Sequence, residues 1–247
     1  MNVSDYLKRR EQISAHEPQY RDLCTSCLQP DYGCYCSAIE KFNPQIEFVI
    51  LIHPIEVKRR IATGRMSHLC LENSHLIKGE DYSENAKVNE LLSDPAFYSM
   101  ILYPGFQSTD LTPLTAQERQ SLFPQDKKIR LFVIDGTWAS AKKMMRKSRN
   151  LHSLPKICFS PSKPSGFKVR KQPHENCFST IEAIHEVIEL AGAACGYDVA
   201  SRKHDNLLAV FGKMVDRQLA YVKVAVEKTS RSEYRRFTRM SAKSLNN

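Results

Sequence analysis

Four cysteines near the start of the chain are spaced like the ligands of a metal ion. The stretch LCTSCLQPDYGCYCS carries Cys24, Cys27, Cys34 and Cys36 in the pattern C-x2-C-x6-C-x-C. Structural zinc sites favour four thiolates in a tetrahedron, and the intervening Pro and Gly suit a tight turn between the two pairs. Because four protein ligands leave no open coordination position, the pattern predicts a structural zinc knuckle. Free or redox-active thiols are the alternative.

A second candidate lies in the stretch IRLFVIDGTW, where an apolar run ends in Asp-Gly-Thr-Trp at residues 135–138. Side chains that follow a parallel strand lie at the carboxyl edge of the sheet, where open α/β folds bind their ligands. We therefore expect Asp135 to project into a site. The alternative is that Asp135 or Thr137 only caps the following helix and that Trp138 fills the core. The sequence lacks the glycine-rich fingerprints of dinucleotide-binding and P-loop proteins.

The elements that must position these residues alternate between strand-like and helix-like segments. Apolar runs of strand length occur at 46–52, 98–105, 129–136 and, more weakly, 156–160. Helical patterns occur at 56–70, 85–93, 115–122, 138–149, 179–192 and 205–227, and Ser179 with Glu182 has the signature of a capping box. Runs that are apolar on both faces suit central parallel strands. The pattern therefore predicts an α/β fold with a mostly parallel sheet flanked by helices.

The composition limits the classes of function. The chain has 247 residues and a formal net charge of +9, which predicts attraction to a polyanion, with nucleic acid the first candidate. It has no apolar run near the roughly 20 residues of a membrane span and no signal-peptide core, so we expect a cytoplasmic protein with no membrane partner. We expect an N-terminal arm with the zinc knuckle at 1–44, a catalytic domain at 45–228 and a basic tail at 229–247.

Five short motifs occur in a characteristic order between residues 24 and 192. They are the cysteine pattern, His53-x-x-Glu56 followed by Thr63-Gly64-Arg65, Leu102-Tyr103-Pro104-Gly105, Asp135-Gly136-Thr137-Trp138, and Ser179-Thr180-x-Glu182-Ala183. Each motif is weak alone, but in this order and spacing they resemble the DTW-domain family, the bacterial tRNA-uridine aminocarboxypropyltransferases. The resemblance implies a SPOUT-like fold with a C-terminal trefoil knot.

The same resemblance implies a reaction and the residues that serve it. S-adenosylmethionine would donate its 3-amino-3-carboxypropyl group to N3 of a tRNA uridine, leaving methylthioadenosine, and the resemblance points to a uridine of the variable loop. Uridine N3 gives up its proton reluctantly, so a positioned carboxylate, Asp135, would serve as the base. The residues implied in donor binding are Thr63, Gly64, Leu102, Tyr103, Pro104, Gly105, Gly136, Thr137, Trp138, Ser179, Thr180 and Glu182. Amides at the start of the Ser179 helix can bind the donor carboxylate, with an ordinary capping box as the alternative.

Basic residues near these motifs are candidates for binding tRNA phosphates. They are Arg59, Arg60, Arg65, Lys142, Lys143, Arg146, Lys147, Arg170 and Lys171. Any one of these groups is more often only a solvated face. Two other functions stay open: a SPOUT-type RNA methyltransferase, and a zinc-knuckle RNA-binding protein without catalytic activity. The sequence is compatible with a monomer or a homodimer.

Overall fold

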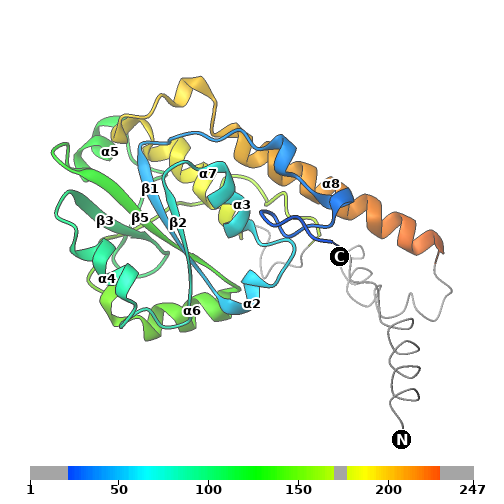
Figure 1. Cartoon of the computed structure of the whole chain (residues 1–247). Coiled ribbons are helices and arrows are strands. Elements are labelled where there is room, and N and C mark those ends of the chain that lie inside the picture. Colours follow the sequence, from blue (N-terminus) through cyan, green and yellow to red (C-terminus); the bar gives the residue numbers. More distant parts are fainter. Residues whose placement is uncertain (1–21, 170–176, 229–247) are drawn as a thin grey trace, which may run out of the picture.

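The computed structural model describes residues 22–169 and 177–228 (Figure 1). The predicted N-terminal arm up to residue 21, the basic tail and two of the RNA-contact candidates, Arg170 and Lys171, lie outside the described residues. Among the helices that are described, none combines the length and the apolar character that crossing a membrane requires.

A six-stranded parallel sheet forms the centre of the described structure. Its strands are β1 (Ile46–Ile52), β2 (Ser74–Lys78), β3 (Phe97–Leu102), β4 (Ser108–Asp110), β5 (Lys128–Asp135) and β6 (Lys156–Cys158). They lie in the order β2-β1-β5-β3-β6-β4, and every pair of neighbours is parallel. The predicted parallel sheet is confirmed. The two short edge strands, β2 and β4, were not predicted, because neither contains a long apolar run.

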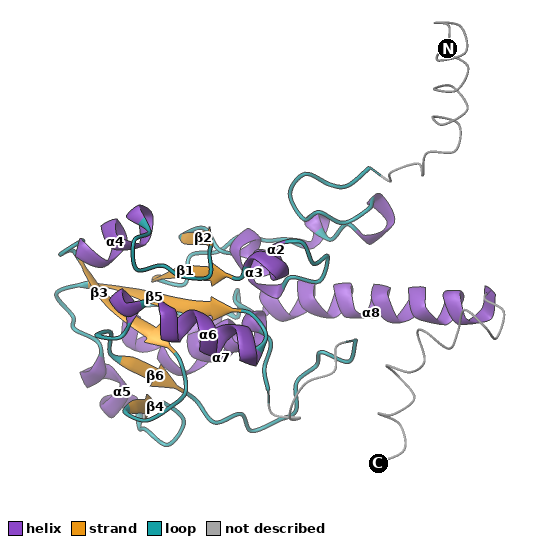
Figure 2. Ribbon diagram, turned by 90° about the horizontal axis from the view of Figure 1, so that it is seen from below, coloured by secondary structure: helices purple, strands orange, loops and turns teal. Residues whose placement is uncertain are grey.

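Helices cover both faces of the sheet, as Figures 1 and 2 show. Alternate residues of β1 point to opposite faces: Phe48 and Ile50 belong to one buried cluster, and Val49 and Leu51 to the other. The first cluster includes side chains of α3 (Thr63–Cys70), α7 (Thr180–Ala191) and α8 (Asp205–Lys228), with α5 (Ala116–Leu122) packed at its edge. The second includes side chains of α4 (Ala86–Ser93) and α6 (Trp138–Lys147). The result is a three-layer α/β/α arrangement.

The helix predicted at 56–70 is two separate helices, α2 (Pro54–Val57) and α3. Arg65 explains part of the break. Its side chain is buried and donates hydrogen bonds to the backbone carbonyls of Val57, the last residue of α2, and of Arg59, in the turn that follows. In this structure the Arg65 guanidinium holds this turn and is not exposed, as the RNA contact that the sequence suggested would have to be.

The cysteine-rich segment packs against α8. Cys27 and Tyr35 are buried in the same cluster as the apolar face of α8. The Arg217 guanidinium donates a hydrogen bond to the carbonyl oxygen of Cys34, and the Asn206 side chain donates to the carbonyl oxygen of Ala38 at 2.9 Å. These contacts tie the N-terminal segment to the C-terminal helix and so to the core.

Candidate active site

A cavity of about 550 Å³ lies at the carboxyl edge of the sheet, beside the ends of β3, β5 and β6. Its volume is within the range of about 300–1,000 Å³ that is typical of small-molecule sites. The apolar part of its lining includes Leu102, Tyr103, Pro104, Val133, Trp138, Phe159, Phe167 and Phe178. The polar part includes Arg59, Thr63, Asp135, Thr137, Ser179 and Thr180. Aromatic walls with a few converging polar groups are the arrangement expected of a binding site for a small organic molecule.

Asp135, the last residue of β5, is the buried acid of this cavity. Its side chain is 5% exposed, and its Oδ1 accepts a hydrogen bond of 2.6 Å from the Thr180 hydroxyl at the start of α7. Gly64 lies on the other side, so close that a Cβ there would stand 2.4 Å from Asp135 Oδ2. The carboxylate therefore lies between the first turns of α3 and α7, whose dipoles favour negative charge at that end.

The structure resolves the two interpretations of Asp-Gly-Thr-Trp. Thr137 is the N-cap of α6, because its Oγ1 accepts a hydrogen bond of 3.1 Å from the Ser140 backbone N–H. Trp138 does not fill the core: it is 40% exposed and lines the cavity. Asp135 also faces the cavity and does not cap the helix. One short turn thus starts a helix and contributes an acid and an indole to one site.

The start of α7 is a capping box that also fixes a neighbouring loop. The Glu182 carboxylate accepts from the backbone N–H and the hydroxyl of Ser179, at 2.8 and 2.6 Å. It also accepts from the Ser165 hydroxyl and the Gly166 N–H, both at 2.7 Å. Glu182 is therefore engaged behind the cavity wall, while Ser179, Thr180 and Ala183 line the cavity itself.

Most of the residues implied in donor binding come together around this cavity. Those that line it are Thr63, Leu102, Tyr103, Pro104, Gly136, Thr137, Trp138, Ser179 and Thr180. Gly64 lies behind Asp135, and Gly105 lines a neighbouring hollow. Phe159 is a lining residue that the sequence reasoning missed. It follows β6 directly, so the rule that pointed to Asp135 at the end of β5 would also have found it.

The basic residues of α6 divide into two pairs. Lys143 and Lys147 place their Nζ atoms 2.8 and 2.7 Å from Oε1 of Glu80, and these hydrogen bonds lower the pKa of Glu80 to about 2. Lys142 and Arg146 instead line the neighbouring hollow, together with Tyr103 and Phe106, which is 90% exposed. Tyr103 also lines the cavity, so the hollow and the cavity are adjacent.

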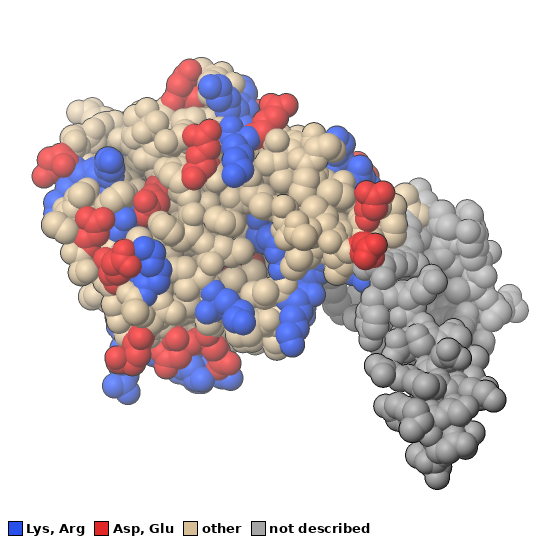
Figure 3. Space-filling view, viewed as in Figure 1, with Lys and Arg blue, Asp and Glu red and all other residues tan. Residues whose placement is uncertain are grey.

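The remaining basic candidates lie near the turn between α2 and α3. Arg59 lines the cavity and pairs with Glu56 at 3.1 Å, and Arg60 is exposed. On the face of the molecule seen in Figure 3, Lys and Arg are interspersed with Asp and Glu. The described residues on that face therefore form no broad basic patch. The basic side chains at the cavity and its adjacent hollow are the more specific feature.

The four cysteines of the N-terminal segment are arranged as metal ligands. Their sulfur atoms all lie within 4.8 Å of one another, and the pairs Cys24–Cys36 and Cys27–Cys34 are each 3.7 Å apart. A tetrahedron of sulfurs around zinc, with bonds of about 2.3 Å, has edges of about 3.8 Å. Hydrogen bonds from the backbone N–H of Cys27, then of Ser26, and from the neighbouring thiols lower the pKa of Cys24 to about 6, while burial and then the neighbouring thiols raise the pKa of Cys36. The donor set fits zinc, whose positive charge would stabilise all four thiolates together.

Comparisons with known proteins identify the family. The DTW domain model matches residues 21–219, more than half of the chain. The chain is 35% identical over 179 residues to tRNA-uridine aminocarboxypropyltransferase 2 of Drosophila melanogaster, across 69% of this chain and 66% of that protein. It is 29% identical over 175 residues to the Mus musculus protein of the same name, across 69% of this chain and 56% of that protein.

A third relative is matched over more of its length. The chain is 23% identical over 227 residues to tRNA-uridine aminocarboxypropyltransferase A of Arabidopsis thaliana, across 82% of this chain and 83% of that protein. The match to each of the first two relatives spans less than two thirds of that protein's own length. No solved structure is significantly similar to the chain. The extent of the domain match, together with the motifs gathered at the cavity, shows that the chain belongs to the DTW domain family.

Proposed function

We propose that the protein transfers the 3-amino-3-carboxypropyl group of S-adenosylmethionine to N3 of a uridine in tRNA. The observation that carries this proposal is the position of Asp135, a buried acid at the wall of an aromatic-lined cavity of suitable size. The names of the relatives in Drosophila, mouse and Arabidopsis support the same reaction. The donor supplies a sulfonium, a leaving group that requires neither a metal ion nor a covalent enzyme intermediate.

Asp135 is the proposed general base. N3 forms the new bond to carbon while the carbon–sulfur bond breaks, and the N3 proton passes to the Asp135 carboxylate. Thr180 holds this carboxylate through its 2.6 Å hydrogen bond, so the acid has one fixed orientation in the cavity. Trp138, Phe159 and Phe178 offer flat apolar surface for the adenine, and they exclude water from the reacting atoms.

Contacts around the remaining wall position the donor. Residues 102–104 and 136–138 border the cavity where the donor would lie. Thr180, in the first turn of α7, is close to where helix amides can bind a carboxylate. The sulfonium of the donor is bonded to three carbons. The main contribution of the protein is to orient the donor so that the carbon of the aminocarboxypropyl group faces uridine N3.

The tRNA is proposed to approach over the hollow that adjoins the cavity. Lys142 and Arg146 line this hollow and can neutralise phosphates, while the exposed ring of Phe106 can stack on an unpaired base. Arg59 at the cavity and the exposed Arg60 extend the basic path toward the turn before α3. Lys143 and Lys147 are engaged with Glu80 and are expected to contribute less.

The four-cysteine cluster is proposed to hold a structural zinc ion. With four protein ligands the ion has no open position, so it would stabilise the N-terminal segment against α8 and take no part in the chemistry. We also propose that the chain from β6 to α8 forms the trefoil knot of a SPOUT-like fold, as the family resemblance implies. An experimental structure in which α7 and α8 do not thread through the preceding loop would contradict the knot.

Mass spectrometry of tRNA treated with the protein and S-adenosylmethionine tests the reaction. We expect an added aminocarboxypropyl group on a uridine and release of methylthioadenosine. An added methyl group would instead identify a SPOUT-type methyltransferase. Titration calorimetry separates both from an RNA-binding protein without catalytic activity, since such a protein would bind tRNA but give no heat with S-adenosylmethionine.

A further inference from the structure

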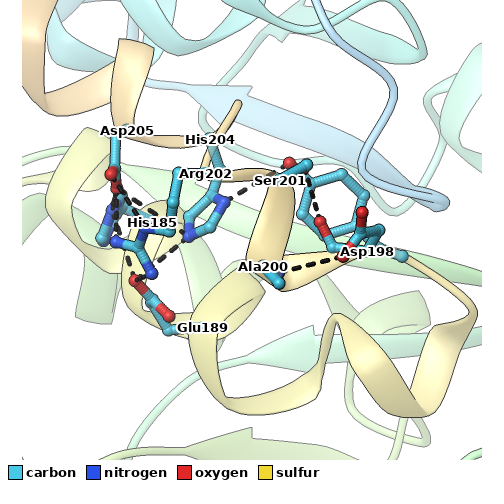
Figure 4. Close-up of polar contacts among 9 residues, drawn as sticks. His185, Glu189, Asp198, Ala200, Ser201, Arg202, His204 and Asp205 are labelled. Carbon is cyan, nitrogen blue, oxygen red and sulfur yellow. Dashed lines mark hydrogen bonds and ion pairs between the residues drawn. The ribbon is translucent and has the colours of Figure 1, made fainter.

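Away from the cavity, a second group of metal-ligating side chains lies between the later turns of α7 and the start of α8. It consists of His185, Glu189, His204 and Asp205, seen in Figure 4. None of the four lines the cavity. At about 1.5 Å of rise per residue, His185 lies about 7.5 Å along α7 from Thr180. We propose that these four residues form a second metal site, suited to zinc(II) and independent of the reaction proposed above.

The distances between the ligand atoms support a tetrahedral site. His185 Nε2 lies 2.9 Å from Asp205 Oδ1, and His204 Nε2 lies 3.1 Å from Glu189 Oε1. The two crossed pairs, His185 with Glu189 and His204 with Asp205, are each 3.9 Å apart, and all four atoms lie within 4.8 Å of one another. Zinc bonded to nitrogen and oxygen at about 2.0–2.1 Å requires edges of about 3.4 Å. The observed distances lie on both sides of that value.

His204 has the surroundings of a metal ligand. It is fully buried, and its Nδ1 is 3.3 Å from the Tyr197 hydroxyl, a partner of the kind that orients a ligating imidazole. Its Nε2 points into the group and lies 3.1 Å from Glu189 Oε1. A metal ion between these two atoms would use both of them as ligands.

The second imidazole is also buried and faces the same group. His185 is 5% exposed, and its Nε2 lies 2.9 Å from Asp205 Oδ1. Two imidazole nitrogens and two carboxylate oxygens suit zinc or another first-row transition ion, whereas magnesium and calcium prefer sites made of oxygen alone.

The Arg202 guanidinium competes with a metal ion for the carboxylate oxygens of this site. Its NH1 is 2.6 Å from Glu189 Oε1 and its NH2 is 2.6 Å from Asp205 Oδ1, which are the same oxygens that a metal ion would use. The Arg202 side chain is half exposed, so it can leave the oxygens for water without burying its charge. The guanidinium therefore neutralises the group when no ion is bound, and a metal ion displaces it.

Cobalt(II) titration of the full chain distinguishes the two sites. Cobalt in the four-cysteine site gives a thiolate charge-transfer band, whereas cobalt in a site of nitrogen and oxygen ligands gives d–d absorption without that band. We expect d–d absorption to keep rising after the charge-transfer band has saturated. In zinc binding measured by elemental analysis, Glu189→Gln should weaken the second site at least tenfold and leave the first unchanged.

Arg202→Ala is the decisive variant, because removing a competitor should tighten binding at the second site. If Arg202 is instead the permanent cation of the group, Arg202→Ala would lose thermal stability that zinc does not restore. Saturation of the wild-type chain at the four-cysteine site alone, with no additional metal bound by Arg202→Ala, would overturn the proposal.

Discussion

The two ends of β5 each bury one charged side chain, and the two charges have different surroundings. Arg130, near the start of the strand, is 2% exposed, and Asp135, at its end, is 5% exposed. Arg130 donates to the Glu47 carboxylate, to the Leu91 carbonyl oxygen and, at 3.4 Å, to Asp94. Its guanidinium also lies 3.7 Å from the centre of the Phe97 ring. Asp135 borders a cavity that Arg130 does not reach.

The difference shows that burial of a charge does not by itself indicate a functional site. A buried guanidinium that is surrounded by acceptors and an aromatic face is compensated within the fold and has no surface left for a ligand. A buried carboxylate that accepts a hydrogen bond from Thr180 and has aromatic walls and open volume beside it is in position to act on a bound molecule. We therefore predict effects on activity at one end of β5 and on stability at the other.

The largest effect is expected for Asp135→Asn. The amide keeps the size of the side chain but cannot accept the N3 proton, so product formation should fall about 10²–10⁴-fold. Affinity for tRNA should stay within a few-fold. The rate is measured by mass spectrometry of modified tRNA, and Thr180→Val is the matched control, since it removes the 2.6 Å hydrogen bond but keeps the carboxylate. If Asp135→Asn keeps more than about a tenth of the wild-type activity, Asp135 is not the base.

Arg130→Met should affect stability instead. It leaves the carboxylates of Glu47 and Asp94 without the cation between them, and the free energy of unfolding should fall by about 3–5 kcal/mol. Urea unfolding measures this change, and calorimetry should find donor affinity unchanged at temperatures where the variant is folded. The double variant with Glu47→Gln should recover part of the loss, because one uncompensated charge is then gone. A change below about 1 kcal/mol would mean that the Arg130 network is not the stabilising feature described here.

Gly64→Ala should reduce activity by about 10²-fold, the effect typical of a misplaced catalytic group. The new Cβ would stand 2.4 Å from Asp135 Oδ2, so the carboxylate must move away from its present position. Gly212→Ala in α8 is the matched control, because a Cβ there meets nothing within 4 Å. That variant should keep full activity and gain up to about 1 kcal/mol of stability. Equal activity of the two variants would show that the catalytic position tolerates movement of Asp135.

Local patterns in the sequence predicted the parts of the fold that depend on neighbouring residues. β1 and β5 appeared as continuous apolar runs because both of their faces are buried. Ser179 and Glu182 form the capping box that their spacing predicted, and Asp135 lies at the cavity because a strand end fixes its place at the edge of the sheet.

Other features depend on contacts that no local pattern contains. The break before α3 relies on the Arg65 side chain, and the basic character of that stretch suggested an RNA contact instead. β2 and β4 are edge strands whose short, partly polar sequences resemble loops. The four side chains of His185, Glu189, His204 and Asp205 meet only when α7 presents one particular face to the start of α8. That orientation is set by the packing of the whole core.

The smallest expected effect concerns tRNA binding at the Asp135 end of the sheet. Lys142→Ala with Arg146→Ala should weaken tRNA binding several-fold and reduce the slope of log affinity against log salt by about 1 for each charge removed. Lys127→Ala with Lys128→Ala is the matched control: it removes the same charge from exposed positions at the Arg130 end of β5. Filter binding at several salt concentrations measures both. Equal slopes for the two double variants would mean that tRNA responds only to the net charge of the protein, and that the hollow beside the cavity is not its path.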